Sequence, residues 1–412
     1  RSTDGIILGM AMRDLKMETL SGGMHMKRQN NFLSLLMLAA LFLGSCKHGE
    51  NDPRIKVERI DGIEHVTSAG DPLRGRIPLE VVELFRIDPD ELKTDSPPHF
   101  DMAAKDDAGN LYLADLRSVG IYKFDSGGRL VSNFLRKGQG PGEFPRFGDL
   151  QIFDGHAWVI GNWPMKIAKF SLDGRFVDEW AFPSVRNFYL RTLVVDEDRF
   201  LTVSYRDLPE GQGRVRVSVL MDSREEFLTQ YYDDADAGIF RIRAGAEEGP
   251  AVASTNPFIA ADIHHAVDRR SGTVFVCNNK EYEIEARDPD GTILLVIRKI
   301  HQKPDLDDAA KEGILGDIAP QLPPQARQSA KEGIPDTLNA IWGISVLPNG
   351  YLAVKRITGL DSVEIDLFDG KGRLLYTILP SAEIPDLKRV TIYGKTVGVI
   401  SEMEDKNVYF EY

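Results

Sequence analysis

Cysteine is scarce in this sequence, and no hydrophobic run is long. Only two of the 412 residues are cysteines, which excludes a small fold held together by disulfides. The most apolar segment, residues 32–43, is shorter than the roughly 20 residues of a membrane-spanning helix, so a multi-span membrane protein is excluded. Basic residues are also in deficit, and the net charge of −13 argues against a nucleic-acid-binding protein.

Catalytic signatures are missing as well. The sequence has no His-Glu-x-x-His, no Gly-x-Ser-x-Gly and no phosphate-binding Gly-x-x-x-x-Gly-Lys. The glycine-rich segment Gly138–Phe144 lacks the glycine spacing of a dinucleotide loop and opens no helix, so we interpret it as a linker between two repeats. We therefore expect a binding protein rather than an enzyme.

The first 45 residues have the layout of an export signal. Lys27 and Arg28 precede the apolar run 32–43, and Leu43–Cys46 resembles the lipobox of bacterial lipoproteins, whose cysteine is acylated. An ordinary secretory signal with a chance cysteine is the alternative. We predict a spurious extension over residues 1–25, a lipoprotein signal over 26–45, a lipid anchor on Cys46 that binds the membrane, and a tether over 46–78 with room for one or two strands.

The rest of the chain repeats a pattern of short alternating strands. In the clearest unit, residues 100–135, the alternation is interrupted by Asp107–Asn110 and Asp125–Arg129, whose glycines supply the positive φ of tight hairpins. Similar units recur over residues 151–180, 192–231, 263–297 and 341–379. The last unit, residues 389–412, has only three strands, and residues 79–87 at the other end of the repeats form a strand without a partner.

These repeats predict an all-β fold, a six-bladed β-propeller of four-stranded antiparallel blades that forms one domain over residues 79–412. The N-terminal strand would complete the sixth blade and close the ring, which removes exposed sheet edges. Residues 233–261 and 302–340 are long insertions between blades, and the second predicts a short helical insertion between blades four and five. Insertions on one face of a repeat fold usually mark the binding face, with lids or packing decoration as the alternative.

Two segments of the first unit, Gly109–Asp115 and Ile121–Asp125, resemble the blades of NHL-type propellers. The linker Gly138–Phe144 is similar to one in the NHL-like or TolB-like six-bladed propeller lipoproteins of Bacteroidetes-type bacteria. The resemblance implies the fold and a cell-envelope location. We expect the outer membrane, facing the periplasm or the exterior, because no aspartate of the inner-membrane retention type follows Cys46. NHL-like propellers include lyases, lactonases and hydrolases, so an enzyme stays as the alternative.

The candidate site is the mouth of the central channel, where the inner strands begin. Acidic, basic and aromatic side chains are expected there, and they suit a small polar molecule, a glycan, a peptide or a protein partner. We predict no catalytic residue and no cofactor; under the enzyme alternative, one of His264 and His265, near Asp101 and Asp149, would hold Ca²⁺ or Zn²⁺. For each residue alone, a structural role in the channel is the competing interpretation. The predicted ligand-binding residues are Asp101, Asp115, Arg117, Asp149, Asn162, Trp163, Arg191, Arg206, His264 and Trp342.

Overall fold

The structure is a computed structural model, and the statements below concern the residues that it describes. The N-terminal leader and Cys46 lie outside them, so the signal and the lipid anchor stay predictions. No helix in the described part of the chain is both long and apolar enough to span a bilayer. The described residues are 52–79, 83–92, 97–162, 165–182, 190–208, 214–234, 240–243, 251–254, 256–381, 384, 387–393, 396–403 and 406–411.

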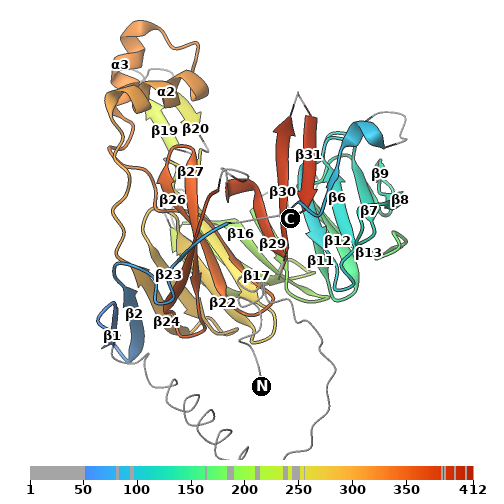
Figure 1. Ribbon diagram of the computed structural model, residues 1–412, viewed down its shortest axis with the longest axis horizontal. Helices are drawn as coiled ribbons and strands as arrows, with labels where there is room; N and C mark the ends of the chain where they lie inside the picture. Colours follow the sequence, from blue (N-terminus) through green and yellow to red (C-terminus); the bar gives the residue numbers. More distant parts are fainter. Residues whose placement is uncertain are drawn as a thin grey trace, which may run out of the picture.

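The first three blades follow one another along the chain, each as a four-stranded antiparallel sheet (Figure 1). Blade one consists of β5 (Met102–Lys105), β6 (Leu111–Asp115), β7 (Gly120–Phe124) and β8 (Leu130–Phe134). Blade two consists of β11 (Asp149–Phe153), β12 (His156–Asn162), β13 (Met165–Ser171) and β14 (Phe176–Ala181). Blade three consists of β15 (Leu190–Val194), β16 (Arg199–Asp207), β17 (Arg214–Asp222) and β18 (Phe227–Asp234).

The last three blades complete the propeller and confirm the predicted six-bladed, mainly β fold. Blade four consists of β21 (Ile263–Asp268), β22 (Thr273–Asn278), β23 (Glu283–Arg287) and β24 (Ile293–Lys299). Blade five consists of β25 (Ile341–Val346), β26 (Leu352–Gly359), β27 (Ser362–Phe368) and β28 (Leu374–Leu379). Blade six consists of β29 (Val390–Tyr393), β30 (Thr396–Met403), β31 (Lys406–Glu411) and β4 (Phe85–Ile87).

Neighbouring blades pack against one another around the channel. The inner strand β11 contacts β5 and β15, β21 contacts β17 and β25, and β30 of blade six contacts β5 of blade one. Apolar side chains fill the spaces between blades one and two, three and four, and four and five. The core is therefore divided into wedges between sheets, as expected of a fold in which each repeat buries its faces only against its neighbours.

The turn between the third and fourth strands has the same chemistry in several blades. The carboxylates of Asp125, Asp288 and Asp369 each accept hydrogen bonds from backbone amides two and four residues later. The turn then needs a left-handed residue, and glycine occupies that position in four blades because it adopts positive φ without a Cβ clash. These glycines are Gly128, Gly174, Gly291 and Gly372, with φ between 72° and 88°.

The segment predicted as a tether is part of the folded structure from residue 52 onward. It contains β1 (Ile55–Ile60), β2 (Ile63–Ser68) and β3 (Arg76–Pro78). The β1–β2 hairpin extends blade four, because β2 pairs in parallel with β24, and β3 pairs in parallel with β28 of blade five. These strands cover outer sheet edges that would otherwise present unpaired backbone groups.

The strand predicted over residues 79–87 is shorter in the structure. Leu79 donates its amide to the carbonyl of Leu379 and still follows the edge of blade five. The strand proper, β4, begins at Phe85 and pairs antiparallel with β31, which places Ile87 opposite Tyr409. The apolar pattern did not reveal this division because both halves of the segment pack against neighbouring sheets.

Two insertions form a projection that we call the tower, made of β19 (Phe240–Arg243), β20 (Ala251–Ser254), α2 (Asp308–Ile318) and α3 (Pro324–Glu332). In the tower α2 contacts β20 and α3 contacts β19, and Figure 1 shows all four elements at one end of the molecule. The carboxylate of Asp307 accepts the amide of Ala310 and caps α2, as expected at a helix N-terminus. The tower confirms the predicted helical insertion between blades four and five.

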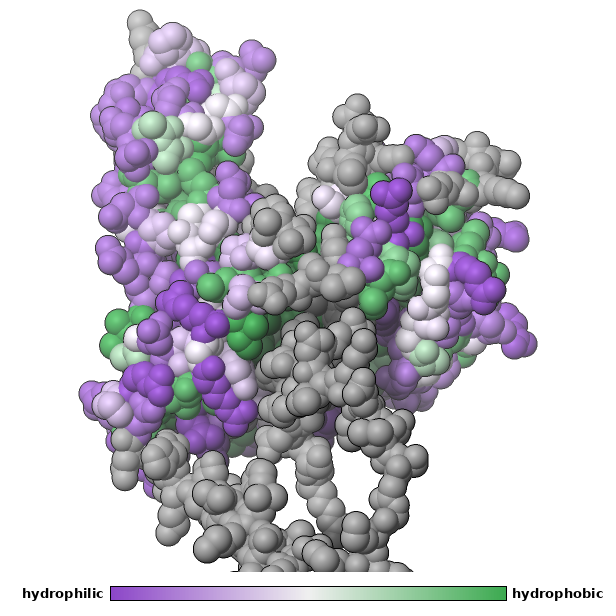
Figure 2. Space-filling view, in the orientation of Figure 1, coloured by the Kyte–Doolittle hydropathy of each residue, from purple (hydrophilic) through white to green (hydrophobic). Residues whose placement is uncertain are grey.

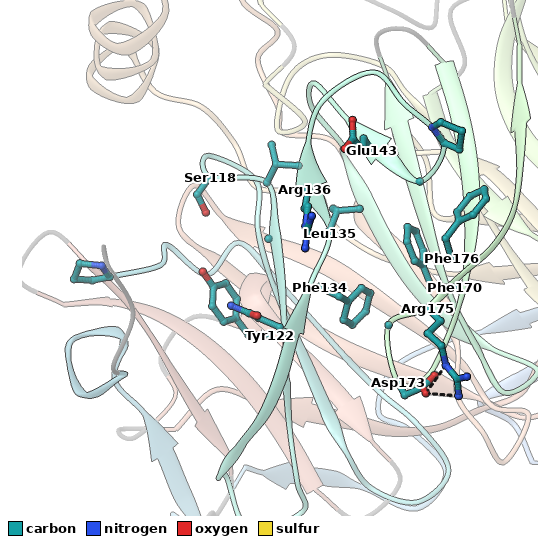
Figure 3. A pocket seen from close by; sticks show the side chains of 17 residues that line it. Ser118, Tyr122, Phe134, Leu135, Arg136, Glu143, Phe170, Asp173, Arg175 and Phe176 are labelled. Carbon is teal, nitrogen blue, oxygen red and sulfur yellow. Dashed lines mark hydrogen bonds and ion pairs between the residues drawn. The ribbon is translucent and has the colours of Figure 1, made fainter.

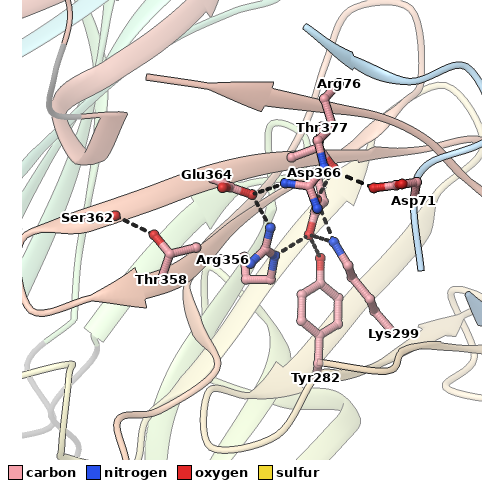
Figure 4. Close-up of polar contacts among 10 residues, drawn as sticks. All are labelled: Asp71, Arg76, Tyr282, Lys299, Arg356, Thr358, Ser362, Glu364, Asp366 and Thr377. Atoms are coloured by element: carbon pink, nitrogen blue, oxygen red, sulfur yellow. Dashed lines mark hydrogen bonds and ion pairs between the residues drawn. The ribbon is translucent and has the colours of Figure 1, made fainter. Parts of the chain in front are cut away.

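A buried ionic network joins blade four to blade five (Figure 4). Asp366 on β27 is fully buried and accepts hydrogen bonds from Lys299 on β24 at 2.8 Å and from Arg356 on β26 at 2.9 Å. The hydroxyls of Tyr282 and Thr377 donate to the same carboxylate at 2.8 and 2.6 Å. Burial disfavours the charged carboxylate, but Arg356 and Lys299 outweigh it and hold the pKa of Asp366 below its ordinary value.

Candidate functional site

The central channel contains a cavity of about 570 Å³ at the end where the inner strands β5 and β11 begin. We call this cavity the channel site. Known small-ligand cavities have volumes of about 300–1,000 Å³, so the channel site is large enough for such a ligand. Residues of blades one, two, five and six line it: His99, Asp101, Met102, Ala103, Arg117, Asp149, Leu150, Lys355, Lys388, Val390, Thr391 and Ile400.

Two carboxylates line the channel site at the start of neighbouring inner strands. Oδ2 of Asp101 accepts the amide of Leu116 at 2.9 Å, and its Oδ1 lies 3.2 Å from Nδ1 of His99. Oδ2 of Asp149 accepts Nε2 of Gln151 at 2.8 Å. Burial raises the pKa of Asp149 above its ordinary value, so this carboxyl takes up a proton more readily than an exposed aspartate.

Three basic side chains line the same cavity. Lys355 on β26 donates from Nζ to the carbonyls of Lys388 and Val390 at 2.8 and 2.9 Å, which ties blade five to blade six. Lys388 belongs to the short 3₁₀ helix Leu387–Arg389. Arg117, in the loop between β6 and β7, is exposed, and its guanidinium makes no hydrogen bond or ion pair with another described residue. Arg117 is therefore available to bind an anionic group.

Arg269 directly follows the inner strand β21 of blade four and contacts two neighbouring blades. Its Nε and Nη2 donate to the carbonyl of Val194 at 3.0 and 2.8 Å, and its Nη2 also donates to Oε1 of Gln151 at 3.2 Å. The guanidinium lies 4.4 Å from the ring centroid of Phe153. These contacts join blades two, three and four.

A second cavity, of about 410 Å³, adjoins the channel site between blades five and six, and we call it the slot. The two cavities share Lys355, Val390 and Thr391 in their walls. The walls of the slot are mainly apolar, in contrast to those of the channel site. The apolar residues that line it are Trp342, Ile344, Val346, Leu347, Ala353, Ile365, Val390 and Ile392.

Arg191 also lines the slot, although it belongs to blade three. Its backbone is left-handed, with φ of 49°, and its Nη2 pairs with Oδ2 of Asp262 at 2.7 Å. Asp262 accepts Nη1 of Arg216 at 2.7 Å as well, and Nε2 of His265 donates to the carbonyl of Arg191. This cluster fixes the Arg191 side chain and connects blade three to blade four.

The structure places five of the predicted site residues at these cavities. Asp101, Arg117 and Asp149 line the channel site. Arg191 and Trp342 line the slot. Four of these five were predicted because they lie at the start of an inner strand. Arg117 was predicted because it lies in a loop between the second and third strands of a blade.

Other predicted residues have structural roles instead. Asp115 is buried, and its oxygens accept hydrogen bonds from the amides of His99, Arg117 and Ser118, so it holds the loop that carries Arg117. Arg206 is exposed, pairs with Asp233 at 3.0 Å, and lines neither cavity. Trp163 and the side chain of Asn162 lie outside the described residues.

His264, which the sequence predicts as a ligand-binding residue at the channel mouth, is buried in the structure. Its ring is 3% exposed and lines neither cavity, and Nε2 has no hydrogen-bond partner among the described residues. Burial lowers the pKa of His264 to about 3, so the ring is neutral at physiological pH. His99, which the sequence analysis did not select, is the histidine beside Asp101.

The cation site expected under the enzyme alternative needs His264 or His265 beside Asp101 and Asp149, and neither histidine lines the channel site with these two aspartates. Among the described residues, no three His, Cys, Asp or Glu side chains are grouped so that they could hold a metal ion.

A third cavity, of about 940 Å³ and larger than the channel site and the slot, lies away from the channel, at the outer side of blades one and two (Figure 3). Phe134, Phe170 and Phe176 line it and pack on one another, with centroid separations of 5.7 and 6.0 Å. Asp173 and Arg175 also line it, and these two exposed side chains form an ion pair with each other. Because its polar groups do not converge, this groove is a weaker candidate than the channel site.

No protein-family model matches this sequence, and no curated protein matches it. Solved structures with a similar fold include a member of the DUF4221 family from Bacteroides vulgatus, 8% identical, with a TM-score of 0.46 and coverage of 87% of this chain and 98% of that one. A gluconolactonase from Xanthomonas campestris is 12% identical, with a TM-score of 0.41 and coverage of 76% and 86%. A Bacteroides fragilis protein described as exported is 12% identical, with a TM-score of 0.39 and coverage of 88% and 96%. The propeller fold of this chain rests on its own strand pairing, and these likenesses assign it no activity.

Proposed function

We propose that this protein is a non-enzymatic binding propeller of the cell envelope that holds a small polar ligand with an acidic group in the channel site. The observation that carries the proposal is the grouping of Arg117, Lys355 and Lys388 with Asp101 and Asp149 around one cavity. The basic side chains suit a carboxylate, and the carboxylates suit hydroxyl or amino groups of the same ligand. A sugar acid, as a free sugar or in a glycan, presents both kinds of group.

Isothermal titration calorimetry with glucuronate tests this proposal, with glucose as the neutral comparator. We expect glucuronate to bind more tightly than glucose, and Arg117→Gln to weaken glucuronate binding about tenfold, because a hydrogen bond to a charged group contributes roughly 1.5–3 kcal/mol. Arg206→Gln is the matched control, since Arg206 is also exposed but lines neither cavity. Equal effects of the two substitutions, or no binding of glucuronate, would contradict the proposal.

The location in the envelope is part of the same proposal. The export signal pattern and the lipobox that ends at Cys46 support a lipoprotein, and the outer membrane is the proposed site. Metabolic labelling with an alkyne fatty acid should tag the full-length protein in a Bacteroidetes host, and Cys46→Ala should abolish the tag and release the protein from membranes. A tag that survives Cys46→Ala would exclude this anchor.

A second candidate function, hydrolysis or elimination at the channel, is favoured by one observation. The Asp149 carboxyl lies in the channel wall with a raised pKa, and a carboxyl of this kind is suited to general acid–base catalysis. Turnover of a glucuronide substrate that Asp149→Asn abolishes, while binding persists, would favour this candidate over the binding protein.

A further inference from the structure

The slot gives the channel site an apolar extension that a purely polar ligand does not use. Ile344 and Val346 of β25 and Ile392 of β29 line it and are only half-buried, so they retain accessible apolar surface. Below it, apolar residues of blades five and six form a continuous core cluster with the base of the tower. Leaving apolar side chains beside a cavity costs free energy that an apolar ligand group would recover.

The slot and the channel site are continuous through shared wall residues. Lys355 lies at the junction, with its ammonium group between the carbonyls of Lys388 and Val390. Trp342 stands in the wall of the slot, where its ring packs on Phe258 at a centroid distance of 4.9 Å. A molecule that entered both cavities would therefore place a charged group near Lys355 and an apolar group beside Trp342.

Two residues that line the slot are exposed. Figure 2 shows the surface hollowed between the part that carries the tower and the part that carries β30 and β31, and hydrophobic residues gather on the tower side of this notch. The exposed residues Ser345 and Thr391 line the slot from β25 and β29, so the slot is open to solvent at the inner strands.

We propose that the ligand is an amphipathic anion, whose acidic polar head occupies the channel site and whose single apolar chain occupies the slot. The inference rests on the proposed binding function and names its ligand class. The charge balance of the wall supports an anionic head, because three basic side chains and two carboxylates line the channel site of a chain whose formal net charge is −13. The apolar wall supports the chain. An acidic glycolipid has this chemistry.

Alkyl glucuronides test the inference with one head and several chains. Titration calorimetry below the micellar concentration would compare glucuronate with its butyl, hexyl, octyl and decyl glycosides, the alkyl glucuronides, in which the carboxylate stays free. We expect the affinity to rise by up to about fourfold per methylene, the equivalent of about 0.8 kcal/mol per buried CH₂, until the slot is filled. An affinity independent of chain length would overturn the inference and leave glucuronate binding, and with it the proposed function, intact.

Ser345→Phe places a ring in the slot from an exposed position on β25. We expect it to remove the gain from the alkyl chain, at least tenfold for the decyl compound, while glucuronate binds as before. Ser132→Phe on the outer strand β8 lies outside both cavities and is the matched control. A decyl affinity unchanged by Ser345→Phe, in a variant whose thermal unfolding matches the parent protein, would overturn the slot as the chain-binding site.

Discussion

Asp366 carries its negative charge where no solvent reaches it, between blades four and five (Figure 4). Its carboxylate is satisfied by Lys299, Arg356, Tyr282 and Thr377. A buried ion pair adds little net stability, but removal of one partner leaves the other charges buried and unpaired. The network therefore specifies how the two blades fit together, and it is sensitive to loss of any member.

Asp366→Asn should lower the free energy of unfolding by up to about 3–5 kcal/mol, because the buried Lys299 would lose the carboxylate that it binds, although Arg356 keeps its ion pair with Glu364. Urea denaturation followed by tryptophan fluorescence measures this change. Asp173→Asn removes a carboxylate from an exposed pair with Arg175 and should leave the urea midpoint unchanged. Coincident midpoints for the two variants would show that the network is dispensable.

Buried histidines make the stability of the protein depend on pH. Burial lowers the pKa of His264 to about 3, whereas an unfolded histidine titrates near 6.5. Between these values the unfolded chain binds a proton that the folded chain does not, so the free energy of unfolding falls as the pH falls below about 6.5. His264→Leu should reduce the slope of the free energy of unfolding against pH by up to about 1.4 kcal/mol per pH unit. Urea denaturation at a series of pH values measures this slope. An unchanged slope would mean that His264 is protonated in the folded protein.

At the scale of elements, the turn between the third and fourth strands was predictable in several blades because its chemistry is local. An aspartate, two further residues and a left-handed glycine recur in the sequence, and Gly128 and Gly372 confirm the positive φ. The parallel pairing of β2 with β24 was missed for the opposite reason. The partners are separated by more than 200 residues, and nothing in the pattern of residues 63–68 identifies which sheet edge they join.

Blade three departs from the turn pattern in a way that predicts a stabilising substitution. Glu225 occupies the left-handed position, with φ of 63°, that glycine fills in four other blades. Glu225→Gly should raise the free energy of unfolding by about 0.5–1 kcal/mol, because a non-glycine residue there costs about 1–2 kcal/mol and the greater freedom of unfolded glycine offsets part of the gain. Thermal and urea unfolding measure the effect.

Gly372→Ala provides the reverse case. Gly372 has φ of 72°, and a Cβ there would lie 2.9 Å from Cγ1 of Ile297, so this variant should be less stable than the parent protein. If Glu225→Gly destabilised the protein while Gly372→Ala behaved as expected, side-chain contacts of Glu225 would outweigh its backbone strain.

At the scale of the whole molecule, the first and last strands of the propeller meet in one blade. Arg86 on β4 is the partner of Phe410 on β31. Paired antiparallel residues have Cα atoms about 4.5–5.5 Å apart, which lies within the range that a disulfide spans. The double variant Arg86→Cys with Phe410→Cys should therefore form a disulfide and stabilise the oxidised protein by about 2–4 kcal/mol.

Thermal unfolding with and without a reductant measures this stabilisation, and a non-reducing gel verifies the bond. The two single-cysteine variants are the controls, because neither can form this disulfide and the native Cys277 is buried. A midpoint that does not change on reduction would indicate that separation of these two strands does not contribute to unfolding.

The candidate site was only partly predictable because it is assembled from distant parts of the chain. Asp101 and Asp149 were found, since the repeat pattern placed both at the start of inner strands. Lys355 and Lys388 were missed, because one lies within a second strand and the other in a 3₁₀ helix that no repeat predicts. The fold depends on local turns and alternation, whereas the charge of the cavity depends on which blades the ring brings together.

The pairing of β2 with blade four also limits how far the propeller can stand from its membrane. Eight residues lie between Cys46 and Ile55, the first residue of β1, and the nine residue-to-residue steps span about 30 Å when the chain is extended. With the proposed lipid on Cys46, the edge of blade four would be held within that reach of the bilayer. In Figure 1 the tower lies at the opposite end of the molecule from β1 and β2, so it would point outward and meet arriving molecules first.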